Sequence, residues 1–204
     1  MTTGQDLLEL SPVMPVVVID DADDAVPTAR ALLAGGIGVI ELTLRTPAAL
    51  SAIERVAAEV PDIVLGAGTV TSPDQAKQAA DAGAKFLVTP GCTDAVVDAC
   101  FDSGLPFLPG ASTVSEAMRL AERGLSALKF FPAEASGGVA YLKSIAGPLP
   151  SLRFCPTGGI TVASAPSYLA LPNVGCIGGS WLTSSLATRD FAKIEKLAAE
   201  AAAL

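Results

Sequence analysis

The chain has 204 residues, and 21 acidic against 13 basic residues give it a formal net charge of −8. Half of its residues are hydrophobic and 17% are charged, which excludes intrinsic disorder and suits one domain over residues 1–204. The acidic balance, with no run of basic residues, argues against nucleic acid or an anionic membrane as a partner. No apolar stretch is long enough to span a membrane and no secretory signal is visible, so we expect a cytoplasmic protein.

Histidine is absent from the sequence, which removes several common kinds of catalytic and metal site. Ser-His-Asp triads, Cys-His pairs and histidine-containing zinc sites all require that side chain. The four cysteines form no CxxC pair, so we expect free thiols. Any chemistry must therefore come from carboxylates, amines, hydroxyls and backbone dipoles, or from a bound cofactor.

Eight short apolar segments typical of β-strands begin 20 to 26 residues apart along the chain. They span residues 14–20, 38–44, 63–70, 86–91, 106–112, 127–132, 153–159 and 174–180. An interval of that length holds one strand, one helix and two short loops. Helical patterns lie between them, among others at residues 25–36, 48–60, 73–84, 93–104 and 113–124.

The helical patterns start and stop with residues typical of helix ends. Ser72-Pro73 and Thr46-Pro47 each place a capping hydroxyl before a proline at the first helical position. Four patterns close with a glycine, namely Gly35, Gly83, Gly104 and Gly124. Eight βα units in series predict an α/β fold of the closed (β/α)8 TIM-barrel type, with an extra amino-terminal helix over residues 3–10.

The second predicted strand carries polar side chains on the face that should point into the barrel. Alternation places Glu41, Thr43 and Arg45 in the lumen, because the opposite face is entirely apolar and should meet the helices. A buried glutamate and arginine on one face can also pair with each other in a purely structural role.

The sixth predicted strand contains the one lysine that does not belong to a helical pattern. Lys129 shares its face with Phe131 inside an apolar strand, where a lysine is rarely buried without a reason. In the structural alternative, the aliphatic part of the Lys129 side chain extends to the barrel mouth and places the charged amine beside a carboxylate. The functional interpretation is an amine nucleophile, which attacks a carbonyl group when neutral to form a Schiff base. Such chemistry needs a proton carrier, and Glu41 is the lumen carboxylate available for it.

Paired glycines end the seventh and eighth predicted strands. Gly158-Gly159 and Gly178-Gly179, the second followed by Ser180, let backbone N–H groups approach an anion closely. The loops after these two strands are the usual phosphate site of such barrels. Arg45 suits a substrate carboxylate, and Thr69 and Thr157 offer hydroxyls at the mouth.

Six motifs in order give the chain a family resemblance. They are ELTLRT from Glu41, GAGTV from Gly66, TPG from Thr89, KFFPAE from Lys129, FCPTGG from Phe154 and CIGGSW from Cys176. Together they resemble the class I 2-dehydro-3-deoxy-phosphogluconate (KDPG) aldolases. The resemblance implies a cytoplasmic lyase of the TIM-barrel fold, usually a homotrimer. It implies cleavage of 2-dehydro-3-deoxy-6-phosphogluconate, a phosphorylated 2-keto-3-deoxy acid, to pyruvate and glyceraldehyde 3-phosphate, with neither a cofactor nor a metal ion.

The resemblance also implies roles for individual residues. Lys129 resembles the Schiff-base lysine and Glu41 the general acid/base. The remaining positions are similar to the substrate pocket: Arg45, Thr69, Pro90, Phe131, Thr157, Gly158, Gly159, Gly179 and Ser180. Two departures bear on substrate preference: Cys92 follows TPG where an aliphatic residue is more familiar, and Asp20-Asp21 end the first strand where basic residues can occur.

Three alternatives remain open from the sequence. The same chemistry can act on the galactonate epimer or on 4-hydroxy-2-oxoglutarate. A sugar-phosphate isomerase or epimerase barrel would keep the glycine site but would not need Lys129. A barrel that only binds its ligand is the third alternative, and the lysine in the strand argues against it.

Overall fold

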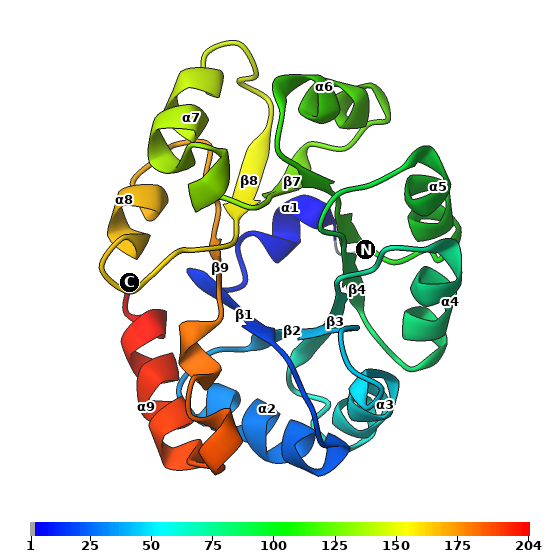
Figure 1. Ribbon diagram of the computed structural model, residues 1–204, viewed down its shortest axis with the longest axis vertical. Coiled ribbons are helices and arrows are strands. Elements are labelled where there is room, and N and C mark those ends of the chain that lie inside the picture. Colours follow the sequence, from blue (N-terminus) through cyan, green and yellow to red (C-terminus); the bar gives the residue numbers. More distant parts are fainter. Residues whose placement is uncertain (1–2) are drawn as a thin grey trace.

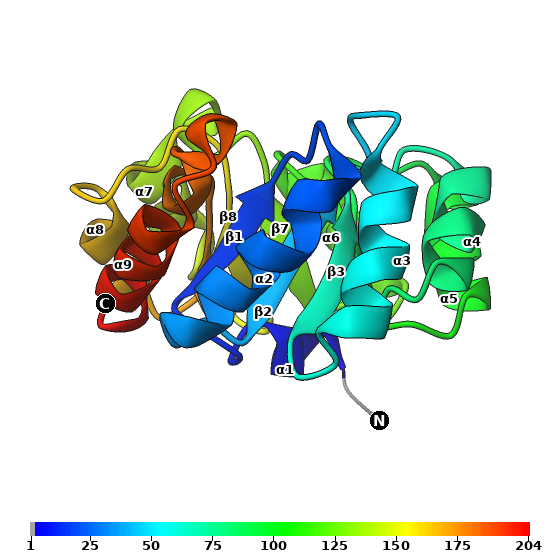
Figure 2. The ribbon, with the colours of Figure 1, turned by 90° about the horizontal axis from the view of Figure 1, so that it is seen from below.

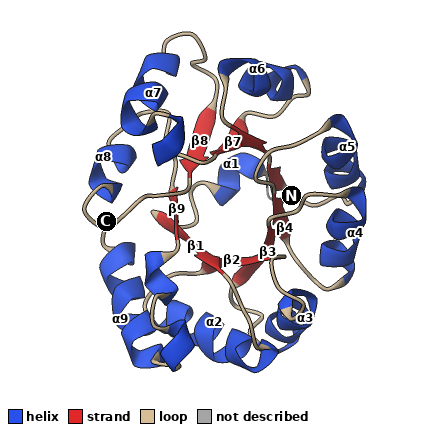
Figure 3. Ribbon diagram, in the orientation of Figure 1, coloured by secondary structure: helices blue, strands red, loops and turns tan. Residues whose placement is uncertain are grey.

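The computed structural model describes residues 3–204, and their strands form a ring surrounded by helices (Figures 1 and 3). All paired strands are parallel, as expected for consecutive βα units. The strands are β1 (Val13–Val17), β2 (Val39–Thr43), β3 (Val64–Gly68), β4 (Phe86–Val88), β5 (Phe107–Leu108), β6 (Gly110–Ala111), β7 (Ala127–Phe130), β8 (Arg153–Pro156) and β9 (Ile177–Gly179). The predicted α/β barrel is confirmed.

The structure has nine strands where eight were predicted, because the fifth predicted strand is divided in two. β5 and β6 are the two halves of the fifth predicted strand, separated at Pro109, which has no N–H to donate to a neighbouring strand. A six-stranded sheet runs β5-β4-β3-β2-β1-β9, and a second sheet runs β6-β7-β8. Single bridges from Phe154 to Val174 and from Thr157 to Gly178 join β8 to the β9 segment and close the ring.

The helices follow the strands and cover the outside of the ring. They are α2 (Ala25–Ala34), α3 (Ala49–Glu59), α4 (Pro73–Asp81), α5 (Asp94–Asp102), α6 (Val114–Glu122), α7 (Gly138–Ile145), α8 (Ala165–Leu169) and α9 (Phe191–Ala202). Their apolar faces pack on the strands, so the core lies between the two layers. None of the helices within residues 3–204 combines the length and hydrophobicity that a membrane span needs.

The predicted amino-terminal helix is present but short. It is α1 (Gly4–Leu7), and Thr3 caps it by accepting a hydrogen bond from the Asp6 N–H. Figure 2 shows α1 at the end of the barrel opposite the loops that follow the strands. Gly4 lies against Ala127 and the Phe107 carbonyl, at the starts of β7 and β5. This helix therefore covers the amino-terminal end of the barrel and leaves the other end open.

Most of the predicted helix ends are confirmed, with one correction. Ser72 caps α4 through the Gln75 N–H, with Pro73 as the first helical residue. Gly83, Gly104 and Gly124 each follow a helix with a positive φ, as expected for helix-ending glycines.

The expectation that Thr46 caps the next helix is wrong. The Thr46 hydroxyl donates to the Ile19 carbonyl instead, and α3 begins three residues later at Ala49 without a side-chain cap. Thr46 therefore ties the end of β2 to the end of β1.

Glu116 provides a test of helix capping in this fold. Thr113 and Glu116 form a reciprocal capping box at the start of α6, and the backbone N–H of Ser112 also binds the Glu116 carboxylate and holds its pKa below the usual value of 4.5. The stabilisation is therefore complete above that value and is lost as the pH falls through the lowered pKa. We expect Glu116→Gln to cost about 0.5 kcal/mol at neutral pH, a small value because the carboxylate is exposed to solvent.

Urea unfolding of both proteins at neutral pH and at about pH 3 tests this expectation. The difference between wild type and variant should shrink at the lower pH. A difference of the same size at both pH values would mean that the charge of Glu116 plays no part.

Candidate active site

The centre of the barrel holds an ion pair between Lys129 on β7 and Glu41 on β2. Lys129 Nζ lies 3.2 Å from Glu41 Oε1 and 3.4 Å from Oε2. The two residues are 3% and 1% exposed, and 88 positions separate them in the sequence. Buried charges are rarely kept without a partner, so each side chain makes the burial of the other possible. The structure thus brings together the two residues that the sequence analysis selected as nucleophile and proton carrier.

The environment of the amine follows from the alternation of side chains along β7. Lys129 points into the lumen and its Nζ lies 5.6 Å from the centre of the Phe131 ring. Phe130 points the other way and stacks on Tyr141 of α7, with ring centres 5.2 Å apart. The predicted alternation is confirmed, and Phe131 gives the amine an aromatic, poorly hydrated neighbour.

The backbone of β3 shapes the space that the Glu41 carboxylate occupies. Gly68 pairs with Thr43 in the register between β2 and β3, and a Cβ on Gly68 would lie 2.0 Å from Glu41 Oε1. Thr43 turns its hydroxyl away from the pair and donates to the Val17 carbonyl at 3.0 Å. Gly68, the second glycine of the GAG segment, is therefore required for close packing against the glutamate.

Gly68→Ala should act on the site through that contact. We expect the methyl group to push the carboxylate away from Lys129 and to lower kcat by about 10²-fold or more, since small misplacements of catalytic groups have effects of that size. Steady-state kinetics on the folded fraction measure the effect. Gly38→Ala, a substitution into open space just before β2, is the matched control and should leave kcat unchanged. Equal kcat for both variants would contradict the packing argument.

Arg45 stands at the mouth, beyond the end of β2. Its Nε donates to Thr69 Oγ1 at 3.0 Å, and Thr69 adopts a φ of +57° that is uncommon for a residue with a branched side chain. The alternative in which Glu41 and Arg45 pair with each other is not observed, because Glu41 pairs with Lys129. Arg45 is thus held by a neutral hydroxyl, and its charge remains available to an anionic group.

A pocket of about 160 Å³ opens at the same end of the barrel. Its walls are Val16, Arg45, Phe131, Thr157, Gly158, Gly159, Ile160, Gly178 and Ser180. Phe131 therefore contacts both this pocket and the buried amine. Gly158 and Gly159 have φ values of +103° and +81°, which residues with a Cβ rarely adopt. Six of the predicted site residues line this one pocket.

Five predicted site residues lie outside the lining of this pocket: the buried pair Lys129 and Glu41, and Thr69, Pro90 and Gly179. Thr69 is hydrogen-bonded to Arg45, and the carbonyl group of Pro90 packs against Gly110. Gly179 faces outward, where a Cβ would lie 2.5 Å from the Trp181 ring. Its neighbour Gly178 takes the predicted place, because a Cβ there would lie 2.1 Å from Thr157 Oγ1.

Gly178 was expected near the anion only as part of the Gly178-Gly179 pair, and the substrate-pocket positions implied by the resemblance include neither it nor Val16 nor Ile160. Gly178 could have been found by applying the alternation of strand faces to the Gly178-Gly179 pair. Val16 and Ile160 are apolar residues in apolar surroundings, and no sequence signal separates them from the core.

Cys155 and Cys176 lie beside the ion pair and are both buried. Cys155 is the register partner of Lys129 in the pairing of β7 with β8. The neighbouring Cys176 thiol lowers the pKa of Cys155, and the Cys155 thiol together with burial raises the pKa of Cys176. The structure contains four free cysteines, as expected from the sequence.

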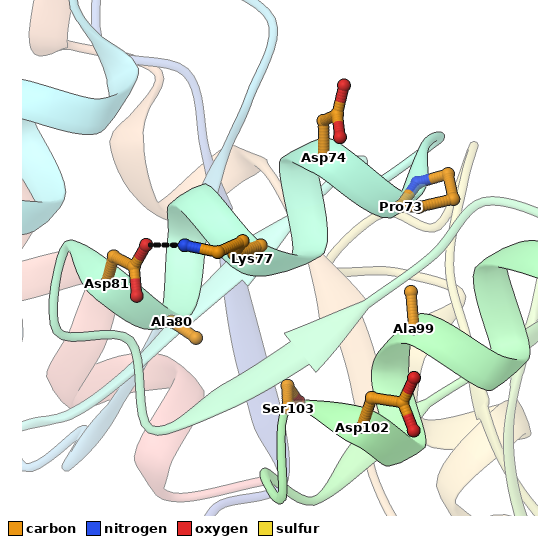
Figure 4. A pocket seen from close by; sticks show the side chains of 8 residues that line it. All are labelled: Pro73, Asp74, Lys77, Ala80, Asp81, Ala99, Asp102 and Ser103. Atoms are coloured by element: carbon orange, nitrogen blue, oxygen red, sulfur yellow. Dashed lines mark hydrogen bonds and ion pairs between the residues drawn. The ribbon is translucent and has the colours of Figure 1, made fainter.

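A second hollow, on the outside of the barrel, lacks the features of a reaction centre. This groove of about 520 Å³ lies between α4 and α5, and Figure 4 shows the side chains around it. Its lysine, Lys77, makes an exposed ion pair with Asp81 one helical turn away. Exposed pairs of this kind are ordinary helix-surface features. Within residues 3–204, no group of three or more His, Cys, Asp and Glu side chains is placed to hold a metal ion.

Fold and site together define a class of protein: a parallel β/α barrel enzyme whose lumen holds a buried lysine–glutamate pair, which suits formation of a Schiff base, near a glycine-lined pocket. Residues 5–197 match the family described as KDPG and KHG aldolase, and the chain belongs to this family.

Known proteins resemble the chain over nearly its whole length. The 2-dehydro-3-deoxy-phosphogluconate aldolase of Dickeya dadantii is 50% identical, over 99% of this chain and 96% of that protein. The KHG/KDPG aldolase of Escherichia coli is 49% identical, over 98% and 95%. A crystal structure of KDPG aldolase from Legionella pneumophila, with pyruvate captured as a covalent carbinolamine intermediate, is 43% identical and superposes with a TM-score of 0.97 over 98% of each chain.

Proposed function

We propose that the protein is a class I aldolase that cleaves 2-dehydro-3-deoxy-6-phosphogluconate to pyruvate and glyceraldehyde 3-phosphate. The observation that carries the proposal is the buried contact of 3.2 Å between Lys129 Nζ and the Glu41 carboxylate. A lysine with a purely structural role is expected on the protein surface, because lysines are rarely buried. The relatives named for this activity, at about half identity over the full length, support the choice of substrate.

The reaction starts with a proton exchange inside the ion pair. When Lys129 passes a proton to Glu41, the amine becomes a nucleophile and the net charge of the pair does not change. The amine attacks the C2 ketone, and a proton moves from nitrogen to the C2 oxygen to give a carbinolamine. Glu41 then protonates the hydroxyl group, water leaves, and an iminium ion remains with an ionised Glu41.

The iminium ion is the electron sink for bond cleavage. Glu41 takes the proton of the C4 hydroxyl, the C3–C4 bond breaks, and its electron pair moves into the enamine while glyceraldehyde 3-phosphate leaves. Glu41 returns the proton to C3. Water then adds to the iminium ion while Glu41 takes a proton from it, the carbinolamine collapses to pyruvate and the amine, and the amine recovers this proton from Glu41, which restores the ion pair. Each proton that Glu41 takes is given back within one turnover, so a single carboxylate is sufficient.

The two ends of the substrate are both anionic and fit the two ends of the site. Arg45, held by Thr69, suits the carboxylate next to the reacting ketone. The glycine-lined side with Gly158, Gly159, Gly178 and Ser180 suits the phosphate, which binds to backbone N–H groups. Pro90 and Gly179 support the walls of the site and do not line it.

A substrate series tests the proposed function. We expect kcat/KM to be highest for the phosphorylated gluconate derivative and lower for its galactonate epimer. Release of pyruvate from none of these acids would contradict the proposal. An isomerase or epimerase would change the sugar phosphate without forming pyruvate.

A second activity, cleavage of 4-hydroxy-2-oxoglutarate, is supported by the family description and by the Escherichia coli relative, whose name includes both activities. This substrate has the same reacting ketone but a carboxylate in place of the phosphate. Its kcat/KM, measured in the same series, decides whether the chain shares this activity.

The assembly and location follow from the family resemblance. We propose one barrel domain per chain, a homotrimer in solution and a cytoplasmic location. Sedimentation or light scattering of the purified protein tests the trimer, and a mass of one chain would contradict it.

A further inference from the structure

A cleft of about 620 Å³ continues from the phosphate side of the pocket. One wall comes from the end of β1 and the residues after it, including Val16, Asp20 and Asp24. The other wall comes from the segment after β9, including Ser180 and Arg189. Val16 and Ser180 line both the cleft and the pocket. The position of one predicted phosphate ligand, Ser180, therefore depends on how the two walls are held together.

Arg189 spans this cleft. Its Nη2 lies 2.8 Å from Asp21 Oδ2, and its Nε lies 2.7 Å from Asp24 Oδ1. In the described part of the chain, these are the side-chain hydrogen bonds and ion pairs that connect the segment after β9 to the residues after β1. The Asp24 side chain is only 16% exposed, so this end of the bridge is shielded from solvent.

The segment that carries Ser180 and Arg189 is folded on itself and can transmit the position of one to the other. Thr183 Oγ1 donates to the Ser180 carbonyl at 3.4 Å, and the N–H of Ser184 donates to the Trp181 carbonyl at 3.1 Å. The buried Ser185 hydroxyl donates to the Asp190 carbonyl at 3.0 Å. These hydrogen bonds are the route by which we expect a displacement at Arg189 to reach Ser180.

The backbone at Arg189 does not favour an arginine. Its φ of +52° lies in the left-handed region, which favours glycine. The guanidinium group is present in spite of this preference, and its two carboxylate contacts are the interactions that offset it. Glycine at this position would remove the bridge and relieve the backbone.

We infer that Arg189 is a positioning residue for the phosphate end of the substrate, because it ties the Ser180 segment to Asp21 and Asp24 across the cleft. The inference rests on the proposed function. Lys129 and Glu41 are held by other strands and by each other, so the bridge acts on binding of the phosphate and leaves bond cleavage unaffected.

Three variants test the bridge: Arg189→Gly, the pair Asp21→Asn with Asp24→Asn, and their combination. For the phosphorylated substrate we expect each to raise KM about 5- to 20-fold with kcat within about twofold of wild type. The combined variant should be no worse than either, since all three remove the same bridge. With unphosphorylated 2-dehydro-3-deoxygluconate, KM should not change. Arg123→Met, which removes an exposed pair with Asp98 on the far side of the barrel, is the control and should behave as wild type.

The outcomes separate the bridge from its alternatives. If Arg189→Gly raises KM while the aspartate variant lowers it, Arg189 contacts the phosphate directly and the bridge is refuted. An unchanged KM in both variants, or equal increases for both substrates, also overturns the inference. If the wild-type protein releases pyruvate and the variants have the same KM as wild type, only the inference about Arg189 is contradicted. If the wild-type protein releases no pyruvate, the proposed function itself is contradicted. Arg189→Lys, which keeps the charge but not the two-pronged contact, should have an intermediate KM.

Discussion

Replacing Lys129 by arginine is expected to lower kcat/KM for the phosphorylated substrate by at least about 10⁴-fold, because a guanidinium group stays charged and forms no Schiff base. Arginine keeps a positive charge beside Glu41, so the variant does not leave a buried carboxylate without a partner. Steady-state release of pyruvate measures the loss. Lys129→Ala should lose at least as much activity and should also be less stable, because it leaves Glu41 buried and unpaired.

The comparison between the two variants is informative by itself. Thermal unfolding should show Lys129→Arg closer to wild type than Lys129→Ala. Lys85, an exposed lysine before β4, is the matched control, and Lys85→Arg should retain full activity. Turnover near the wild-type rate in either Lys129 variant would exclude the proposed mechanism.

Glu41→Gln is expected to lower kcat about 10²- to 10⁴-fold, the usual contribution of a positioned general acid/base. The amide has the size of the carboxylate and can still contact Lys129, but it neither takes nor returns a proton. Dehydration of the carbinolamine, cleavage of the C3–C4 bond and protonation of the enamine should therefore all be slow. Measurement of kcat and KM should show the loss mainly in kcat.

A second measurement separates the proton-carrying role of Glu41 from a structural one. Exchange of the methyl protons of pyruvate with solvent, followed by NMR in deuterated buffer, requires formation of the Schiff base and the enamine steps but no cleavage of the C3–C4 bond. We expect Glu41→Gln to slow this exchange along with cleavage. If Glu41→Gln exchanges these protons at the wild-type rate but no longer cleaves the substrate, a group other than Glu41 transfers the proton at C3.

The architecture could be predicted because its signals are local. The apolar run of each strand and the residues at helix ends, such as Ser72 before α4 and Gly83 after it, are patterns within a few neighbouring residues, and the structure confirms them. Thr46 was misassigned because the alternative partner of its hydroxyl, the Ile19 carbonyl, is 27 positions away. The division of the fifth strand into β5 and β6 depends on pairing with two different sheets, which no local pattern records.

The two residues at the centre of the site could also be predicted from the sequence, whereas several residues around them could not. Lys129 and Glu41 stood out because charged residues inside apolar strands are rare, and alternation placed both in the lumen. Gly178 and Gly179 face opposite sides of β9, so that a Cβ on Gly178 would meet Thr157 in the pocket and a Cβ on Gly179 would meet the Trp181 ring. The Arg45–Thr69 hydrogen bond and the thiol pair of Cys155 and Cys176 join different strands, so they emerge only from the assembled barrel.

Trapping with borohydride shows whether Lys129 forms a Schiff base, since the reagent reduces an iminium ion to a stable amine. The wild-type protein is incubated with pyruvate and borohydride and then digested for peptide mass analysis. The account predicts one reduced pyruvate per chain, located on the peptide that contains Lys129, and none in Lys129→Arg. Unmodified protein after this treatment, or a pyruvate adduct on another lysine, would contradict it.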